Sequence, residues 1–376
     1  MKNLLIDNHK LLYHETELKK ALAGEPIAPI YVDLGIHNAC NYRCVHCGPG
    51  FRGHGGLHIK REPLLALMKD MGEAGVKSVL IGGTGEPSLN PYLVESVEIG
   101  KKHGLDIALT SNGSLLNKDK LERILPHLTW MRFNILTTSE SNFHDMHLPI
   151  KKSGNVREDV IENLKHAVRI KKENNLDVVI NVVTCVFEEN LDDIESTVKL
   201  VKDIGIDYIM IKPPSLNEKN AEQYDKFNVT VTTKYKSLKE LESYSTDTFS
   251  VIVRWNAFDD EHKKEYNKCF GLPYIWQVDG DGGVYACGSF LQEDKYCYGN
   301  INEQSFRDIV KSQHTCSVMK YAENMPDFKY CDTHCRPHTI NKFLWTLKHH
   351  SDGENFLAEA IEQTKKRNKP NHINFI

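Results

Sequence analysis

Three cysteines lie close together in the first part of the chain, Cys40, Cys44 and Cys47, in the spacing Cys-x3-Cys-x2-Cys. Three thiolates on one short loop can bind three irons of a cubane cluster and leave the fourth iron open to an exogenous ligand. A zinc ion would need a fourth protein ligand, which His37 or His46 could supply. The spacing therefore predicts an iron-sulfur site with one open iron, and a zinc site is the alternative.

Four more cysteines lie further along the chain: Cys269, Cys287, Cys331 and Cys335. Twelve residues, Gly282 and four further residues separate the first two. Four thiolates on two segments can close a cluster completely, which suits electron transfer. A structural zinc knuckle is the alternative, and His334 or His338 could replace one thiolate.

Short β-branched runs alternate with stretches of helical period from residue 30 onward, which is typical of parallel β-α units. Strands are predicted at residues 30–36, 78–83, 106–112, 129–136, 177–186 and 207–212. Helices are predicted between them near residues 63–75, 91–104, 117–128, 156–175 and 190–204. These units predict an α/β fold with a partial (β/α)6 barrel, in which ligands collect at the carboxyl ends of the strands. The cysteine loop follows the first strand and is expected at that end.

The regular alternation stops after the sixth strand. A polar stretch at 215–224 leads to a helical segment near 232–245, and a hairpin is predicted over 274–290, with helices near 305–322 and 339–349. The predicted divisions are an N-terminal extension at 1–29, the partial barrel at 30–214, a linker or bridging region at 215–268, a small α+β metal-cluster domain at 269–350 and a helical tail at 351–376.

Two further strand ends carry residues suited to ligand binding. The second strand ends in Gly82-Gly83-Thr84-Gly85-Glu86-Pro87, where glycines allow close backbone approach and a carboxylate can accept a hydrogen bond from a cation. The third ends in Thr110-Ser111-Asn112-Gly113, which could also be an ordinary polar turn.

The cysteine spacing, its place after the first strand and these strand ends together resemble the radical S-adenosylmethionine (radical SAM) superfamily over residues 30–214. In that family the open iron chelates S-adenosylmethionine (SAM), and one electron from the cluster breaks the sulfonium bond to give a 5'-deoxyadenosyl radical. The resemblance implies a SAM-binding [4Fe-4S] cluster on the first three cysteines, reduced by a flavodoxin- or ferredoxin-like protein. It implies SAM contacts from Gly83, Gly85, Glu86, Ser111, Asn112 and Asn134. Thr84 is an insertion among the glycines, and Asn134 stands where relatives often carry a serine.

The C-terminal cysteines resemble those of the SPASM and twitch extensions of radical SAM enzymes. A full SPASM domain carries seven cysteines for two auxiliary clusters, and this chain lacks the additional pair expected shortly before Cys331. The resemblance therefore implies one auxiliary [4Fe-4S] cluster in a small twitch/SPASM-like iron-sulfur domain.

The resemblance also implies a class of substrate. Radical SAM enzymes of this size with a twitch extension include aminoglycoside dehydrogenases and epimerases, so a small polyhydroxylated substrate is expected: an amino sugar, an aminocyclitol or a nucleotide sugar. Five residues could line its cavity: Arg132, Asn181, Lys212, Arg254 and Trp255.

Cys185 bears on the outcome of the reaction. It lies near the carboxyl end of the fifth predicted strand, where alternate side chains face the barrel interior, so its thiol could return a hydrogen atom in an epimerisation. Most lone cysteines, Cys297 and Cys316 among them, are expected to be small core residues. Dehydrogenation, with the auxiliary cluster accepting an electron, is therefore favoured over epimerisation.

Two other classes of function are open to such a chain. A SPASM-type peptide-modifying maturase often carries a leader-binding domain, and the 29 residues before the first strand are too few for an independent fold. A non-catalytic iron-sulfur electron carrier would not need the glycine turn with Glu86. Both are less favoured than the enzyme acting on a small molecule.

Composition excludes several kinds of partner. Lys plus Arg number 47 against 51 Asp plus Glu, a formal net charge of -4, so no nucleic-acid or membrane partner is expected. No apolar run of about 18 residues and no apolar signal region are found. Cysteines grouped as metal ligands are typical of a reducing compartment, which predicts a cytoplasmic location.

Replacing Cys40, Cys44 and Cys47 together by Ala should remove one cubane cluster and abolish SAM cleavage, while the C-terminal cluster stays in place, because separate loops hold the two sets. Iron content and 5'-deoxyadenosine, both measured after anaerobic reconstitution, check this, with Cys316→Ala as the control. An iron content and a rate of SAM cleavage equal to those of the unmodified protein would show that these three cysteines do not bind the cluster.

Overall fold

The computed structural model describes residues 5, 8–48, 50, 53–151, 155–215, 218–220, 222, 230, 232–259, 264–332 and 334–376. The strands are β1 (Tyr31–Leu34), β2 (Ser78–Ile81), β3 (Asp106–Ser111), β4 (Leu128–Asn134), β5 (Val179–Cys185), β6 (Tyr208–Lys212), β7 (Ser250–Val253), β8 (Ile275–Val278), β9 (Gly283–Tyr285) and β10 (Cys297–Asn300). The helices are α1 (Glu15–Leu22), α2 (Arg61–Ala74), α3 (Leu93–Lys102), α4 (Lys118–Ile124), α5 (Phe143–His147), α6 (Val156–Glu173), α7 (Ile194–Ile204), α9 (Trp255–Asp259), α10 (Phe306–Lys311), α11 (Gln313–Glu323), α12 (His338–His349) and α13 (Gly353–Lys366).

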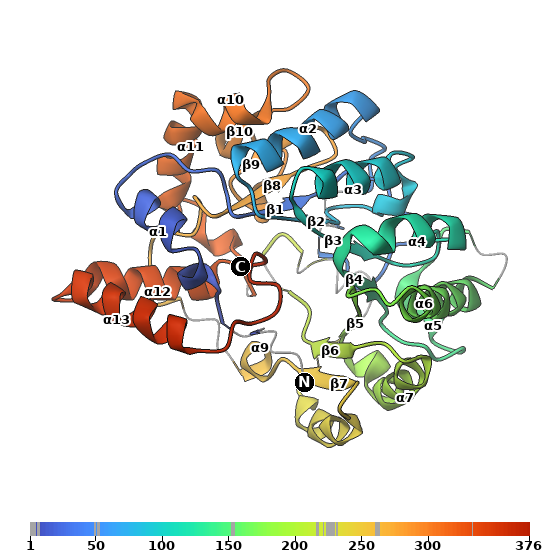
Figure 1. The fold of residues 1–376 in the computed structure, drawn as a ribbon. Coiled ribbons are helices and arrows are strands. Elements are labelled where there is room, and N and C mark those ends of the chain that lie inside the picture. Colours follow the sequence, from blue (N-terminus) through green and yellow to red (C-terminus); the bar gives the residue numbers. More distant parts are fainter. Residues whose placement is uncertain are drawn as a thin grey trace.

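The first six strands pair in parallel and in chain order, and helices α2, α3, α4, α6 and α7 cover their outer side (Figure 1). This confirms the predicted α/β partial barrel. The short apolar strands are buried on both faces, as parallel strands under helices must be. Helices α2 and α7 end at Gly75 and Gly205, whose φ values of 100° and 89° turn the chain into the next strand.

The sheet is larger than the sequence indicates. Its ten strands run in the order β10-β9-β8-β1-β2-β3-β4-β5-β6-β7. Strand β7 adds to β6, and β8 pairs in parallel with β1, so that Tyr31 lies opposite Ile275 and Leu34 opposite Val278. The predicted hairpin is formed by β8 and β9, but it belongs to the same sheet as the barrel. Strand β1 is therefore hydrogen-bonded on both sides.

The segments beside the barrel agree in part with expectation. Half of the predicted stretch 215–224 lies outside the described residues, and the helical segment near 232–245 contains a 3-10 helix at Tyr235–Tyr244. The division into domains stays a prediction. Within the described residues, no helix has the length and hydrophobicity that a membrane crossing requires.

The amino-terminal end of the barrel is closed by the two ends of the chain. Phe375 and Ile376 are buried against the inner side chains of the strands, with the Phe375 ring 5.3 Å from that of Trp130. Lys10 donates from Nζ to the carbonyl oxygen of His372 at 3.0 Å. The barrel interior therefore opens toward the carboxyl ends of the strands.

A buried carboxylate joins the hairpin to the barrel. Asp279, between β8 and β9, has no solvent exposure. Its Oδ1 accepts from Thr84 Oγ1 at 2.8 Å, and its Oδ2 accepts from Asn38 Nδ2 at 3.2 Å and Gln292 Nε2 at 2.8 Å. Thr84 Oγ1 also lies 2.9 Å from Asn38 Oδ1. The inserted threonine thus links the loops after β1 and β2 to the C-terminal hairpin.

The Thr84→Val variant should lower the free energy of unfolding by about 1–3 kcal/mol, because the buried Asp279 carboxylate loses a donor. Urea unfolding of the reconstituted protein measures the change. Thr129→Val is the matched control, since no hydrogen bond joins the Thr129 hydroxyl to another described residue. Equal free energies of unfolding for the two variants would show that the hydrogen bond between Thr84 and Asp279 does not contribute to stability.

Candidate active site

The loop after β1 carries the first three cysteines and is fastened at several points. Arg43 N donates to the carbonyl of Leu148 at 3.0 Å, and Val45 N to that of Met146 at 3.1 Å, which fixes the loop against α5. Burial raises the pKa of Cys40 to about 11 and of Cys47 to about 12, because the buried thiolates lose solvation. The charge of Glu86 adds to the rise at Cys40, and that of Cys40 adds to the rise at Cys47. Iron binding must therefore supply the positive charge that stabilises three thiolates here.

The glycine turn after β2 packs directly on this loop. A Cβ at Gly85 would lie 2.3 Å from the carbonyl oxygen of His37, and one at Gly83 would lie 2.3 Å from the Cα of Gly35. Glu86 N donates to the carbonyl of Ala39 at 2.8 Å. Only glycine leaves room for this contact, so the turn positions the cysteine loop itself.

Glu86 lies at the centre of a hydrogen-bond network and is 2% exposed. Its Oε1 accepts from Ser88 N at 3.0 Å, from Ser88 Oγ at 2.6 Å and from Ser111 Oγ at 2.7 Å. Its Oε2 accepts from Asn112 N at 2.8 Å. The carboxylate therefore joins the ends of β2 and β3, and Oε2 keeps an acceptor position that an ammonium group could use.

Asn112 fastens the end of β3 to the cysteine loop. Its Nδ2 donates to Asn41 Oδ1 at 2.8 Å and lies 4.0 Å from Cys40 Sγ. Its Oδ1 accepts from Ser114 N at 3.0 Å. The structure thus brings Gly83, Gly85, Glu86, Ser111 and Asn112 together around the loop that carries the cysteines. Asn134 stands apart from this network, because its Nδ2 donates to Thr110 Oγ1 at 3.0 Å.

The four C-terminal cysteines line one cavity of about 390 Å3. Burial raises the pKa of Cys269, Cys287 and Cys331 to about 11 each, and the other three thiols contribute to the raised pKa of Cys335. Four soft donors on one cavity fit an iron-sulfur cluster. Gly83 and Thr84 line the same cavity, so it adjoins the glycine turn of the barrel.

The described residues contain no group of three or more His, Cys, Asp or Glu side chains placed to hold a single metal ion. A cubane cluster distributes its thiolates over different irons, so its ligands lie further apart than those of one zinc ion. The donor chemistry at both cysteine sets fits such clusters.

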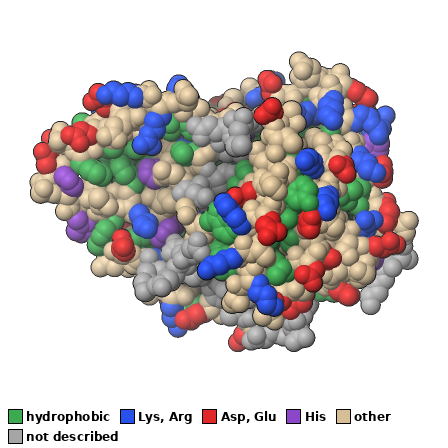
Figure 2. All heavy atoms as spheres, turned by 90° about the horizontal axis from the view of Figure 1, so that it is seen from below, with side chains coloured by type: hydrophobic (Ala, Val, Ile, Leu, Met, Phe, Trp, Pro, Cys, Tyr) green, Lys and Arg blue, Asp and Glu red, His purple; other side chains and the backbone are tan. Residues whose placement is uncertain are grey.

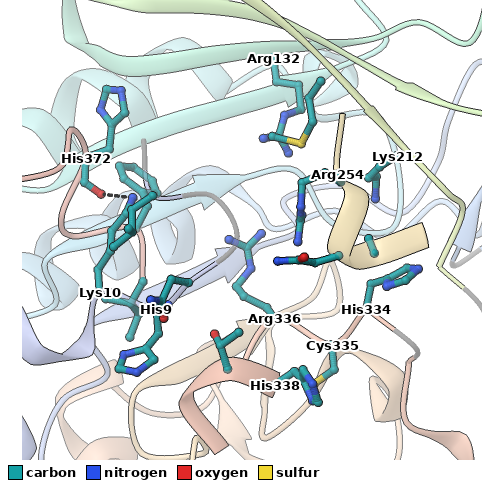
Figure 3. Close-up of a pocket in the computed structure, with 18 of the residues that line it drawn as sticks. His9, Lys10, Arg132, Lys212, Arg254, His334, Cys335, Arg336, His338 and His372 are labelled. Atoms are coloured by element: carbon teal, nitrogen blue, oxygen red, sulfur yellow. Dashed lines mark hydrogen bonds between the residues drawn. The ribbon is translucent and has the colours of Figure 1, made fainter. Parts of the chain in front are cut away.

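A larger cavity of about 650 Å3 occupies the barrel interior (Figure 3). Of the five residues expected to line a cavity, Arg132, Lys212 and Arg254 do so. Asn181 instead supports Arg132, whose Nε lies 3.2 Å from its Oδ1. Trp255 donates from Nε1 to Glu242 at 2.6 Å and is not among the lining residues.

Several lining residues were not predicted from the sequence: His9, Lys10, Arg336, His372 and Phe375. They come from the two ends of the chain and from the C-terminal cysteine segment. No local pattern marks them, because only the closed tertiary structure brings them to the barrel. Arg336 follows Cys335, and both residues line the two cavities.

Residues 34–201 match the radical SAM superfamily, and residues 269–336 match the SPASM iron-sulfur cluster-binding domain. The protein is therefore a radical SAM enzyme with a C-terminal SPASM domain. A SAM-binding [4Fe-4S] cluster, an auxiliary iron-sulfur centre and SAM itself belong to these two domains.

Individual relatives are distant. The chain is 24% identical over 307 residues to the tungsten-containing aldehyde ferredoxin oxidoreductase cofactor-modifying protein of Pyrococcus furiosus, an alignment that covers 75% of this chain and 81% of that protein. It is 28% identical over 129 residues to an S-adenosylmethionine-dependent nucleotide dehydratase of Flammeovirga pacifica, which covers 33% of this chain and 44% of the relative. SuiB of Streptococcus suis bound to S-adenosylmethionine shares the fold, with a TM-score of 0.58 and 16% identity over 79% of this chain and 68% of SuiB.

The Glu86→Gln variant should weaken SAM binding by roughly one to two orders of magnitude, because a hydrogen bond to a charged group contributes about 1.5–3 kcal/mol. The variant should retain its cluster iron, because the cysteines and not Glu86 are expected to bind the cluster. Calorimetric titration with SAM and an iron assay measure both. Glu95→Gln, which neutralises an exposed carboxylate on α3, is the control, and an affinity equal to that of this control would place Glu86 outside the SAM site.

Proposed function

We propose that the protein abstracts a hydrogen atom from a small polyhydroxylated molecule in the barrel cavity and releases a product oxidised by two electrons. One observation carries the proposal: Cys335 lines both the barrel cavity and the cavity of the four C-terminal thiols. A substrate in the barrel would therefore lie beside the auxiliary centre. The cavity volume of about 650 Å3 is typical of small-molecule sites.

Seven cysteines would bind two separate clusters. Cys40, Cys44 and Cys47 would hold the SAM-binding cluster, and Cys269, Cys287, Cys331 and Cys335 would hold the auxiliary cluster. With both groups and SAM bound, the site supplies a 5'-deoxyadenosyl radical and an acceptor for one further electron. A flavodoxin- or ferredoxin-like reductant in the cytoplasm would deliver the initiating electron.

Other residues orient the reactants and exclude water. Glu86 and Asn112 would hold SAM at the carboxyl ends of β2 and β3, beside the cysteine loop. Trp130 and Phe375 close the opposite end of the barrel with packed rings. A radical formed in such an enclosed space is protected from solvent.

The surroundings of Cys185 favour dehydrogenation. The thiol is 5% exposed and packs with Val45, Leu136 and Phe187, and it is not among the residues that line the barrel cavity. Burial raises the pKa of Cys185, so the group stays a thiol. A hydrogen donor for epimerisation would have to reach the substrate, whereas an acceptor at Cys335 borders the cavity.

The substrate class rests on the cavity and on the relatives. One relative is named as a nucleotide dehydratase, which supports a small molecule that contains a nucleotide. A peptide-modifying maturase is less favoured, because the barrel cavity of about 650 Å3 has the size typical of a small-molecule site. A carrier without catalysis is excluded by membership of the enzyme superfamily.

Anaerobic assays in heavy water with candidate substrates should give 5'-deoxyadenosine together with a product that is two electrons more oxidised and contains no solvent deuterium. The Cys185→Ala variant should form this product at the rate of the Cys316→Ala control, because Cys185 lies outside the cavity. Mass spectrometry of product and coproduct measures both. An isomerised product that gains one deuterium, and that Cys185→Ala no longer forms, would establish epimerisation instead.

A further inference from the structure

The barrel cavity has an uneven charge. Six Lys and Arg side chains line it: Lys10, Arg132, Lys212, Arg254, Arg336 and Lys342. Four histidines join them: His9, His334, His338 and His372. None of the described residues in its lining is Asp or Glu. The chain as a whole has a formal net charge of -4, and on the face drawn in Figure 2 basic and acidic side chains are interspersed. The excess of positive charge is therefore local to the cavity.

Two of these cations interact with other residues of the chain. Arg336 lies 3.6 Å from Asp33 Oδ2, and its guanidinium carbon lies 4.6 Å from the centre of the Tyr31 ring. Lys10 donates to backbone carbonyl groups of the C-terminal segment. These contacts explain why the two side chains are there. Of the other four cations, Lys342 lies on α12, and Arg132, Lys212 and Arg254 belong to the barrel.

Arg132, Lys212 and Arg254 come from neighbouring parts of the barrel. Arg132 lies on the interior side of β4, Lys212 is the last residue of β6, and Arg254 directly follows β7. Figure 3 shows the three side chains extending into the same cavity. They stand toward the carboxyl ends of their strands, where barrels bind substrates.

Arg132 is held in place without being neutralised. Its Nε donates to Asn181 Oδ1 at 3.2 Å, and its guanidinium carbon lies 4.9 Å from the centre of the Trp130 ring. Asn181 is itself fixed by a bond from Nδ2 to the carbonyl of Met131 at 3.0 Å. Within the described part of the chain, neither Arg132 nor Lys212 forms an ion pair with a carboxylate. The arrangement orients the guanidinium group for a ligand.

We propose that Arg132, Lys212 and Arg254 bind a phosphate group of the substrate. This inference rests on the proposed function and selects among its substrate classes. Like charges gathered in one cavity repel one another, and a bound anion removes that cost. A guanidinium fork pairs with phosphate through two parallel hydrogen bonds, and a phosphate monoester carries about two negative charges against one for a carboxylate. A nucleotide sugar therefore fits the cavity, whereas a protonated amino sugar or aminocyclitol is repelled.

The reconstituted holoenzyme is titrated calorimetrically with inorganic pyrophosphate, citrate and glucosamine, without any turnover. Pyrophosphate should bind more tightly than citrate, and glucosamine should not bind. Arg254→Gln and Lys212→Met should each weaken pyrophosphate binding by roughly 10–100-fold, since each removes a charge-assisted hydrogen bond. Arg254→Lys, which keeps the charge but loses the fork, should fall between Arg254→Gln and the unchanged protein. Arg123→Gln, which removes an exposed arginine on α4, is the matched control and should bind as the unchanged protein does.

Three results would overturn the proposal. Equal pyrophosphate affinity in Arg254→Gln, Lys212→Met and Arg123→Gln would place the anion elsewhere. Tighter binding of citrate or of glucosamine would assign a carboxylate or an amine to the cavity. A loss of SAM affinity with pyrophosphate binding unchanged would mean that these cations hold the methionyl carboxylate. Iron content and SAM affinity of each variant show that it is folded, and 5'-deoxyadenosine formation tests the proposed function separately from phosphate binding.

Discussion

The contact between the glycine turn and the cysteine loop is the constraint on which the active site depends. A side chain at Gly85 would collide with the carbonyl of His37, so the turn can lie on the loop only because no Cβ is present. From that contact the Glu86 backbone reaches Ala39, and its carboxylate reaches Ser111 and Asn112. The ends of three strands are thus held at one point before any iron or SAM contributes. Because these loops are already ordered, the free energy of SAM binding is not spent on ordering them and can contribute to catalysis.

The sequence predicts those parts of the protein that are encoded locally. The periodicity of apolar residues gives six strands and five helices because each repeats over a short window, and the structure has all of them. The cysteine spacings and the turn with Glu86 are equally local, and the family matches confirm the class that they indicate. Strand β8 was predicted as part of a hairpin, but its pairing with β1 was not. That pairing joins Tyr31 to Ile275, which are far apart in sequence, and nothing in either short strand specifies the other.

The same limit applies to the side chains of the cavity. Arg132 and Lys212 were identifiable because each stands in a predicted strand of the barrel. Arg254 was named as a candidate although the strand before it, β7, was not predicted. Lys10 and His372 were not, since their positions depend on hydrogen bonds between the two ends of the chain. Thr84 looked like a neutral insertion in the glycine turn. Its role became visible only with Asp279 beside it, because a buried carboxylate requires donors that the sequence does not pair with it.

The parallel pairing of β8 with β1 gives the C-terminal domain a structural role in the barrel. Strand β1 has buried residues at Tyr31, Val32 and Leu34, and β8 saturates one side of its backbone. A chain cut before residue 269 would leave β1 as an exposed, apolar sheet edge with free N–H and C=O groups, which is a template for aggregation. The iron-sulfur domain is therefore an edge cover of the barrel as well as a carrier of cysteines, and it cannot be exchanged as an independent module without a strand to replace β8.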